Sequence, residues 1–237
     1  MKKTLGIVTL GLAVLTSSLA YAKDSSVVFG GGSVGQDTAY GYLGAVTAIN
    51  GNIDRNGFLA RVSGGYGSYK YDSTTFTRNV DGNFGTADVM AGYQQILDMG
   101  HVAGYVGYTY EDHNLSPKDV GNEVRGGKSG AKAQVELDLN LDPHMVLKNV
   151  SNYSTPFDSY WTQTYVGWKC PKGKLSVGPE IAFLGNDEFD QQRYGIRVDD
   201  IKIIKKTQLY VSGGYLKAEG LGSNDGAYGS IGFSSKF

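Results

Sequence analysis

The sequence predicts an all-β protein, specifically a transmembrane antiparallel up-and-down β-barrel of about 12 strands, on three observations. Apolar and polar residues alternate at period 2 in run after run along the chain. The face opposite the apolar one carries charged residues, which points these charges into the protein. The chain ends in Phe237, with Phe233 and Ile231 on the same face. Strands with apolar residues outside and charges inside are typical of a barrel whose outer wall meets lipid.

The stretch 158–198 shows this alternation in three successive strands. The faces assigned to lipid hold Tyr160, Thr162, Thr164, Val166, Trp168, Leu175, Val177, Pro179, Ile181, Phe183, Tyr194, Ile196 and Val198. The opposite faces hold Trp161, Gln163, Tyr165, Glu180, Arg193, Arg197 and Asp199. A soluble sheet would place such charges in water, so their inward position favours a membrane barrel over a soluble protein.

Strands are expected at 26–34, 39–49, 58–71, 85–97, 102–111, 128–140, 145–153, 159–169, 174–184, 193–200, 208–217 and 227–237. The run 128–140 alternates most regularly, with Leu137 outward and Glu136 inward. The run 145–153 is the weakest, because Lys148 and Asn149 are adjacent.

The connections between these strands differ in length on the two rims. Tight turns are expected at 98–101, 141–144 and 170–173, and longer polar loops at 73–83, 114–127, 185–192 and 218–226. Short periplasmic turns and long outer loops are typical of outer-membrane barrels with both termini inside. The short links after the first and seventh strands depart from this pattern.

The N-terminus predicts export. Lys2 and Lys3 precede an apolar run, and residues 20–22 (Ala-Tyr-Ala) fit a signal-peptidase site, so we expect a signal peptide at 1–22 and the barrel domain at 23–237. A transmembrane helix is the alternative, but about 15 mostly apolar residues are few for a span. The residue directly after the cleavage site is Lys23 and not the Cys that anchors a lipoprotein. The expected location is the cell outer membrane. The aromatic last strand resembles the signal that the barrel-assembly machinery reads, although Ser235 departs from it.

Composition limits the other classes of protein. The formal net charge of −1 gives no attraction to nucleic acid. The single cysteine, Cys170, forms no intrachain disulfide. The 35 Gly and 17 Tyr are the unusual feature, because glycine in a strand lets the aromatic ring of a neighbouring strand lie over bare backbone.

Three segments resemble a known family. They are 154–161 (STPFDSYW), 176–180 (SVGPE) and 183–193 (FLGNDEFDQQR), with 50–51 and 57–67 similar in order. The chain is similar over nearly its whole mature length to the cellulose biosynthesis protein BcsS family. The resemblance implies an outer-membrane barrel that accompanies bacterial cellulose synthesis and secretion, and it brings no catalytic residues with it.

The inward residues are the candidate functional site. They are Arg61, Asp88, Lys132, Glu136, Asp138, Trp161, Tyr165, Glu180, Arg193, Arg197 and Asp199. Closure of twelve strands gives a backbone diameter of roughly 24 Å, which leaves about 10 Å for one extended glucan chain if nothing folds inside. The charges either pair into a plug or border a wet channel. Trp161 and Tyr165 could stack on sugar rings, although packing in the wall is the preferred interpretation.

Other groups of residues do not predict a cofactor site, a metal site or an active site. Gly30, Gly32 and Gly35 have a G-x-G-x-x-G spacing, but no helix follows them. Asn186, Asp187, Glu188 and Asp190 could bind calcium, yet a solvated loop is the simpler interpretation. Lys202, Lys205 and Lys206 fit a solvated rim. His101 and His144 fall in turns and His113 lies near Glu111, so no Ser–His pair for lipid hydrolysis is recognisable.

The sequence therefore predicts a non-enzymatic barrel that accompanies cellulose secretion, as a structural component or a saccharide passage. Its expected partners are outer-membrane lipid, the barrel-assembly machinery, and cellulose or the components that secrete it. A lipid-modifying barrel enzyme and a soluble secreted β-sandwich are the alternatives.

Overall fold

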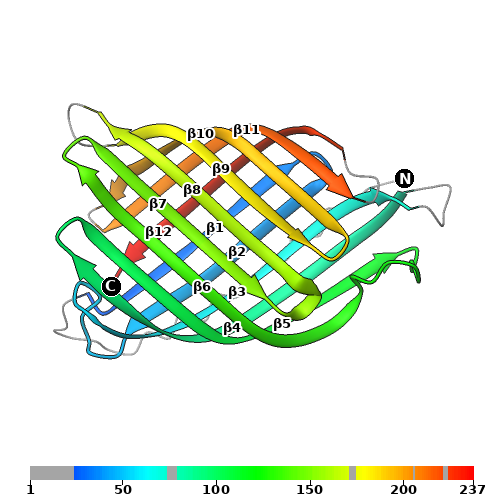
Figure 1. Cartoon of the computed structure of the whole chain (residues 1–237), viewed down its shortest axis with the longest axis horizontal. Coiled ribbons are helices and arrows are strands. Elements are labelled where there is room, and N and C mark those ends of the chain that lie inside the picture. Colours follow the sequence, from blue (N-terminus) through cyan, green and yellow to red (C-terminus); the bar gives the residue numbers. More distant parts are fainter. Residues whose placement is uncertain (1–23, 74–78, 171–174, 205, 221–223) are drawn as a thin grey trace.

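The computed structural model describes residues 24–73, 79–170, 175–204, 206–220 and 224–237, and these form one closed antiparallel β-barrel (Figure 1). Its strands are β1 (Ser26–Gly35), β2 (Thr38–Ala48), β3 (Gly57–Asp72), β4 (Asn79–Leu97), β5 (Gly100–Ser116), β6 (Gly126–Asp142), β7 (Met145–Ser154), β8 (Ser159–Lys169), β9 (Ser176–Asn186), β10 (Phe189–Ile204), β11 (Thr207–Gly220) and β12 (Gly226–Lys236). A short 3₁₀ helix, η1 (Pro156–Asp158), joins β7 to β8. The predicted fold class is confirmed, and closure excludes the β-sandwich. The predicted signal peptide lies outside the described residues.

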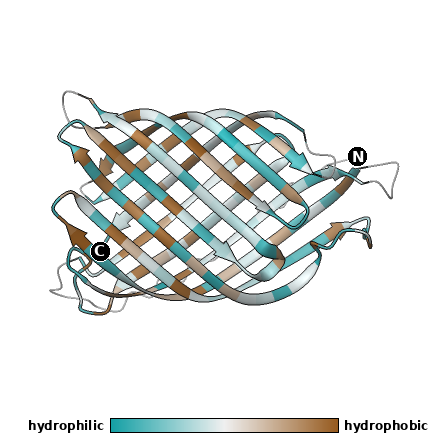
Figure 2. Ribbon diagram, in the orientation of Figure 1, coloured by the Kyte–Doolittle hydropathy of each residue, from teal (hydrophilic) through white to brown (hydrophobic). Residues whose placement is uncertain are grey.

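The outer wall is apolar. Large apolar side chains that the fold leaves exposed follow the outward face of strand after strand, among them Phe58, Val62, Tyr66, Val89, Tyr93, Val106, Tyr108, Val135, Trp168, Ile181, Tyr194, Ile196, Val211 and Ile231. Figure 2 shows the resulting bands of apolar and polar residues along each strand. Exposed apolar surface of this extent marks contact with lipid or with another protein. Within the described residues, no helix is long and apolar enough to cross a membrane.

The first and last strands close the barrel. β1 pairs with β12 from Val27 opposite Lys236 to Gly35 opposite Tyr228. Ser25 N–H donates to the Phe237 carbonyl at 2.6 Å, and Phe237 N–H donates to the Ser26 carbonyl at 2.8 Å. Closure leaves no strand edge unpaired in the described wall, as a barrel in hydrocarbon requires.

The two rims differ in what covers them. The terminal rim, defined by residues 24 and 237, also carries the connections 49–56, 98–99 and 143–144. The loop rim, at the other end, carries the connections 36–37, 117–125, 155–158 and 187–188. The predicted difference in length, with short turns on one rim and long loops on the other, holds for the two-residue turns after β4 and β6. It fails after β2, because eight residues connect β2 to β3 on the terminal rim, where a short turn was expected.

Several strands extend further toward the loop rim than predicted. β4 begins at Asn79 and β5 ends at Ser116, because glycine, serine and asparagine in these ends still pair in the ladder. The loop predicted at 185–192 is wrong: β9 reaches Asn186, β10 starts at Phe189, and two residues join them. Alternating side chains there are polar on both faces, so hydropathy did not reveal the hairpin.

β7 is a regular strand with a polar outer face. Asn149 Nδ2 donates to Thr164 Oγ1 at 2.9 Å and to the Gln163 carbonyl at 3.2 Å, and Ser151 Oγ lies 2.6 Å from Thr162 Oγ1. These outward side chains therefore satisfy one another, which a wall facing hydrocarbon requires. Their polarity is the reason that β7 alternates poorly in sequence.

Candidate functional site: the barrel interior

Polar side chains on the inward faces meet across the barrel. Arg61 on β3 lies 2.7 Å from Glu136 on β6, although two strands separate β3 and β6 in the wall. Tyr42 Oη on β2 lies 3.2 Å from Tyr210 Oη on β11, again two strands away. Such contacts form only through the interior, so they identify the faces that point inward.

The first network lies on β3–β6. Glu136 accepts from Arg61 Nη1 and from Gln134 Nε2 at 2.6 Å. Asp88 accepts from Lys132 Nζ and from Ser63 Oγ, both at 3.0 Å. Each cation here has a carboxylate partner, so burial of the charges is offset by pairing.

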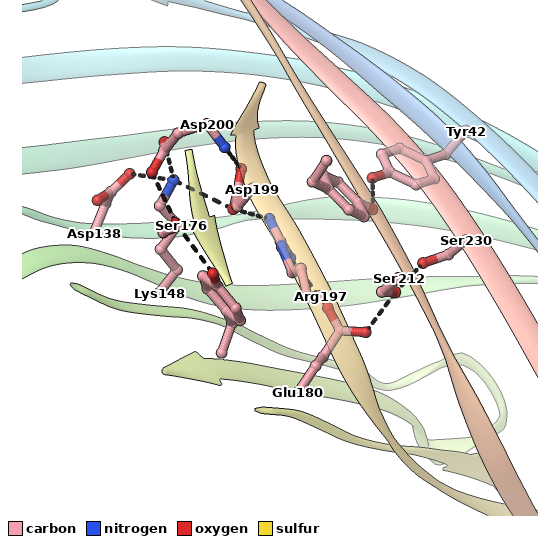
Figure 3. Close-up of polar contacts among 12 residues, drawn as sticks. Tyr42, Asp138, Lys148, Ser176, Glu180, Arg197, Asp199, Asp200, Ser212 and Ser230 are labelled. Carbon is pink, nitrogen blue, oxygen red and sulfur yellow. Dashed lines mark hydrogen bonds and ion pairs between the residues drawn. The ribbon is translucent and has the colours of Figure 1, made fainter. Parts of the chain in front are cut away.

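The second network lies on β6–β10 and centres on Lys148 (Figure 3). Lys148 Nζ lies 2.9 Å from Asp200, 3.3 Å from Asp199 and 3.8 Å from Asp138. Ser176 Oγ donates to the second oxygen of Asp200 at 3.0 Å. The Lys148 ammonium on β7 thus holds three carboxylates from two other strands, β6 and β10.

A β-bulge explains why two successive aspartates face inward. The register of β10 on β11 shifts between Val198 and Ile201, and Asp200 has φ 60°. A left-handed residue at a bulge adds one residue to one strand, so Asp199 and Asp200 both turn to the same side. Strict alternation would have sent Asp200 outward.

Arg197 extends the second network toward β11 and β12. Its guanidinium lies 2.6 Å from Asp199 and 3.3 Å from Glu180. Glu180 also accepts from Ser212 Oγ at 2.7 Å, and Ser212 contacts Ser230 at 2.6 Å. Both carboxylate oxygens of the buried Glu180 therefore have a hydrogen-bond donor.

Trp161 and Tyr165, which were considered for sugar stacking with wall packing preferred, lie near arginines. Arg197 lies 5.1 Å from the Tyr165 ring centroid, and Arg193 lies 5.5 Å from that of Trp161. Tyr165 is 1 % exposed, and its hydroxyl donates to Ser176 at 3.0 Å. Tyr165 thus packs in the wall, which was the preferred interpretation.

Most inward aromatic rings lie on a glycine of the wall. A Cβ on Gly65 would be 2.2 Å from Tyr40 Oη, one on Gly67 would be 2.3 Å from Phe84, and one on Gly44 would be 2.3 Å from Phe29. On Gly82 it would meet Cε2, Cζ and Cε1 of Tyr69 at 2.4, 2.4 and 2.9 Å, distances that place the face of the ring over the backbone. The rings therefore lie flat against the wall and leave the centre of the barrel to other groups.

The β7–β8 connection turns into the loop-rim end of the barrel. Phe157 in η1 has φ 55° and is 1 % exposed, with its ring centroid 4.9 Å from His113 and 4.2 Å from Lys128 Nζ. Ser154 and Ser159 hydroxyls donate to Glu111 at 2.8 and 3.2 Å and hold η1 in place.

This cluster brings together serine, glutamate and histidine, a combination that sequence spacing did not reveal. His113 Nε2 lies 3.9 Å from Glu111, and its Nδ1 lies 3.2 Å from Tyr69 Oη. Each serine donates to the carboxylate, whereas an activated nucleophile donates to a base such as the imidazole. The arrangement fits an anchor for η1.

Loop 117–125 covers the same end of the barrel. Asp119 is 2 % exposed and accepts from Ser73 Oγ at 2.7 Å and Tyr71 Oη at 3.1 Å, both from the β3 side. The hydrogen bond from Ser73 lowers the pKa of Asp119. Glu123 N–H donates to Glu188 at 3.2 Å, so the loop reaches the β9–β10 turn.

A profile of the family described as cellulose biosynthesis protein BcsS matches residues 27–237. The chain belongs to this family. A search of curated proteins found no match. BcsS membership confirms the resemblance that the motifs indicated.

Solved structures with a fold similar to that of this BcsS-family chain share little sequence identity with it, and two of them are described as channels. The COG4313 outer membrane channel from Pseudomonas putida F1 is 12% identical, with 92% of this chain and 97% of that chain covered and a TM-score of 0.59. The TodX deltaS2S3 mutant monoaromatic hydrocarbon channel is 9% identical, with 90% and 91% covered and a TM-score of 0.54. At such identity the likeness concerns the fold alone.

The structure places most of the other residues that the sequence analysis of this BcsS-family chain singled out. Asn186 Oδ1 accepts from Glu188 N–H at 3.1 Å, and Asp190 accepts from Tyr160 Oη at 2.6 Å. Within the described residues no cluster of His, Cys, Asp and Glu has the arrangement of a metal site. Gly30, Gly32 and Gly35 lie in β1. Cys170 is free, and Lys205 lies outside the described residues.

Sequence reasoning missed several members of the BcsS interior. Lys148 and Asp200 complete the second network, and Phe29, Tyr40, Tyr42, Tyr69 and Phe84 form much of the aromatic wall. The signal for the rings was present, because the inward face of β2 alternates Tyr40, Tyr42 and Gly44. The signal for Asp200 was not, because a bulge breaks the period.

Proposed function

We propose that this protein is an outer-membrane barrel of the cellulose export apparatus that gives passage to a saccharide chain and performs no covalent chemistry. The observation that carries the proposal is the contrast between its two surfaces. The outer wall is apolar, whereas the interior is polar, with aromatic rings flat on the wall and charges paired on either side. Family membership supplies the link to cellulose.

The inward charges suit a neutral solute. Arg61, Lys132, Lys148 and Arg197 each contact a carboxylate. Arg193 is buried and donates to Gln191 Oε1 at 2.6 Å instead. A passage for anions usually presents unpaired cations, as in the Arg and Lys rings of anion pores. The carboxylates of Glu136 and Asp138 are partly exposed, so they can still accept hydrogen bonds from the hydroxyl groups of a sugar.

Three kinds of partner follow from the proposal. Lipid of the outer membrane covers the apolar wall, and the barrel-assembly machinery inserts the chain, with the strand that ends at Phe237 as its signal. The third partner is cellulose, or the components that secrete it. The loop rim faces outward in this arrangement, so loop 117–125 must move for a chain to leave.

The test is conductance of the purified protein in a planar bilayer. We expect single channels whose conductance rises when residues 117–125 are replaced by a short Gly-Ser linker. A matched control replaces 143–144, the exposed turn on the terminal rim, and should leave conductance unchanged. Absence of channels from both the native protein and the linker variant, in samples that shift on SDS gels only after boiling, would refute the passage.

A further inference from the structure

We propose that an aromatic lane on the inner wall of β1–β4 binds an extended, neutral chain of β-linked pyranoses. The lane consists of Phe29, Tyr42, Tyr40, Phe84 and Tyr69. The inference rests on the proposed function and deepens it by naming the class of saccharide and the surface that holds it.

The rings of the lane follow one another without a gap along the barrel. Successive centroids are 6.4 Å apart from Phe29 to Tyr42, 6.0 Å to Tyr40, 5.5 Å to Phe84 and 6.1 Å to Tyr69. Phe29 lies near the terminal-rim end of β1, and Tyr69 lies near the loop-rim end of β3. The spacing is close to the length of one sugar in an extended chain, so each ring can meet one pyranose.

The lane remains accessible where other inward rings do not. Its five side chains are half-buried. By contrast, Tyr105, Tyr165 and Tyr228 are buried. Burial is what distinguishes the two groups, because an arginine also lies near one lane ring, with Arg61 4.3 Å from the Phe29 centroid. Glycines under the lane let its rings lie against the wall. Tyr42, Tyr40 and Phe84 form its flattest part, with interplanar angles of 21° and 5°, and the end rings Phe29 and Tyr69 are tilted from their neighbours by 43° and 48°. A nearly flat aromatic surface suits the face of a sugar.

The chemistry of the lane selects the ligand. In a β-linked glucan the hydroxyls are equatorial, so both faces of each ring present C–H groups, and these pack on the electron-rich face of an aromatic ring. Hydroxyls at the edge of the sugar then reach polar groups beside the lane. Ser63 and Asp88 lie on one side, and the Tyr42–Tyr210 hydroxyl pair lies on the other.

An acidic polysaccharide fits less well. Each cation of the first network, which flanks the lane, already contacts a carboxylate. Arg61 also lies 4.3 Å from the Phe29 ring centroid, which holds its guanidinium on the wall. A uronate chain would have to displace these partners, so neutral sugar is favoured.

The experiment is calorimetric titration of the full mature protein in detergent micelles with cellohexaose, with maltohexaose and oligogalacturonate as comparison ligands. We expect binding of cellohexaose and at least tenfold weaker binding of the other two. The variants Tyr40→Leu and Phe84→Leu keep apolar volume but remove the ring, and each should weaken cellohexaose binding about tenfold. Tyr66→Leu, an outward tyrosine on β3, is the matched control and should bind as the native protein does.

The outcomes separate this inference from the passage. Channels without cellohexaose binding would overturn the lane and leave the passage standing. Binding without channels would overturn the passage and leave the lane standing. Equal affinity for cellohexaose and maltohexaose in the native protein would overturn the proposed ligand class, and this comparison needs no variant to fold. Native affinity in both leucine variants would place the ligand elsewhere.

Discussion

Arg61 on β3 and Glu136 on β6 form an ion pair of 2.7 Å across two intervening strands. Their side chains are only 10% and 22% exposed, so neither charge has enough water to stand alone. The pair therefore ties two parts of the wall that share no ladder hydrogen bond.

Glu136→Arg should destabilise the barrel. It removes the partner of Arg61 and adds a like charge beside it, and breaking such a buried pair costs about 3–5 kcal/mol. The measurement is the urea midpoint of unfolding in micelles. The double exchange Arg61→Glu with Glu136→Arg should recover much of the loss, and an unchanged midpoint in the single variant would contradict the pairing.

Leu137→Arg tests the outward face beside Glu136. Leu137 lies on the outer side of β6, so a charge there enters hydrocarbon and should cost about 2–4 kcal/mol. We expect reduced insertion into lipid vesicles, scored by the fraction that shifts on SDS gels after boiling. Leu137→Ile is the control. Normal insertion of the arginine variant would mean that this face does not meet lipid.

Gly65→Ala tests the packing of rings on glycine. The added methyl would lie 2.2 Å from Tyr40 Oη, and overpacking of this kind typically costs about 1–3 kcal/mol. Gly41→Ala, on the outer face of β2, is the matched control, because its methyl would have no atom closer than 3.8 Å. Thermal unfolding should separate the two variants, and equal midpoints would show that Tyr40 does not lie on Gly65.

The Asp119 anchor predicts how loop 117–125 responds to pH. Hydrogen bonding lowers the pKa of Asp119 from 3.8, so the folded state favours the carboxylate. The anchor's contribution is therefore fully present above pH 3.8 and is lost as pH falls through the lowered value. Limited proteolysis of the loop should be slow at pH 7 and at pH 5 and faster near pH 3. Asp119→Asn should be cleaved quickly at all three, and cleavage that rises already at pH 5 would contradict the assignment.

Orientation can be tested with epitope tags. A tag at Val120, which is 67% exposed in loop 117–125, should be reached by antibody on intact cells. A tag at Pro143, in the exposed turn on the terminal rim, should be reached only after the outer membrane is opened. Asn122 is a poor site, because it is 4% exposed and its side chain accepts from Val124 N–H. Reversed labelling would mean that the loop rim faces the periplasm.

For most strands, the residues that point inward could be predicted from sequence, because the alternation of polar and apolar residues has one physical cause. Each strand separates an apolar medium from a polar interior, so Glu136 and Leu137 differ in kind as well as in direction. The family, too, was recognisable from short motifs. Strand ends were harder, since beyond the apolar band, as at Asn79 or Ser116, both faces are polar.

The contacts inside the barrel could not be predicted in the same way. Which inward residues meet depends on barrel closure, since Arg61 and Glu136 are 75 residues apart and share no ladder. Asp200 faces inward only because of a bulge, and Phe157 is buried only because its connection turns into the barrel. These features depend on three-dimensional closure, which period-2 patterns do not encode.

The hydrogen bonds between Ser25, Ser26 and Phe237 have a consequence for biogenesis. Because β1 pairs with β12, the wall cannot close before the segment that ends at Phe237 is in place. Until then, two long edges have free N–H and C=O groups that can pair with any neighbouring chain. The cell must therefore keep the incomplete sheet apart from its copies, and a chain truncated by even a few C-terminal residues should persist as an aggregation-prone edge.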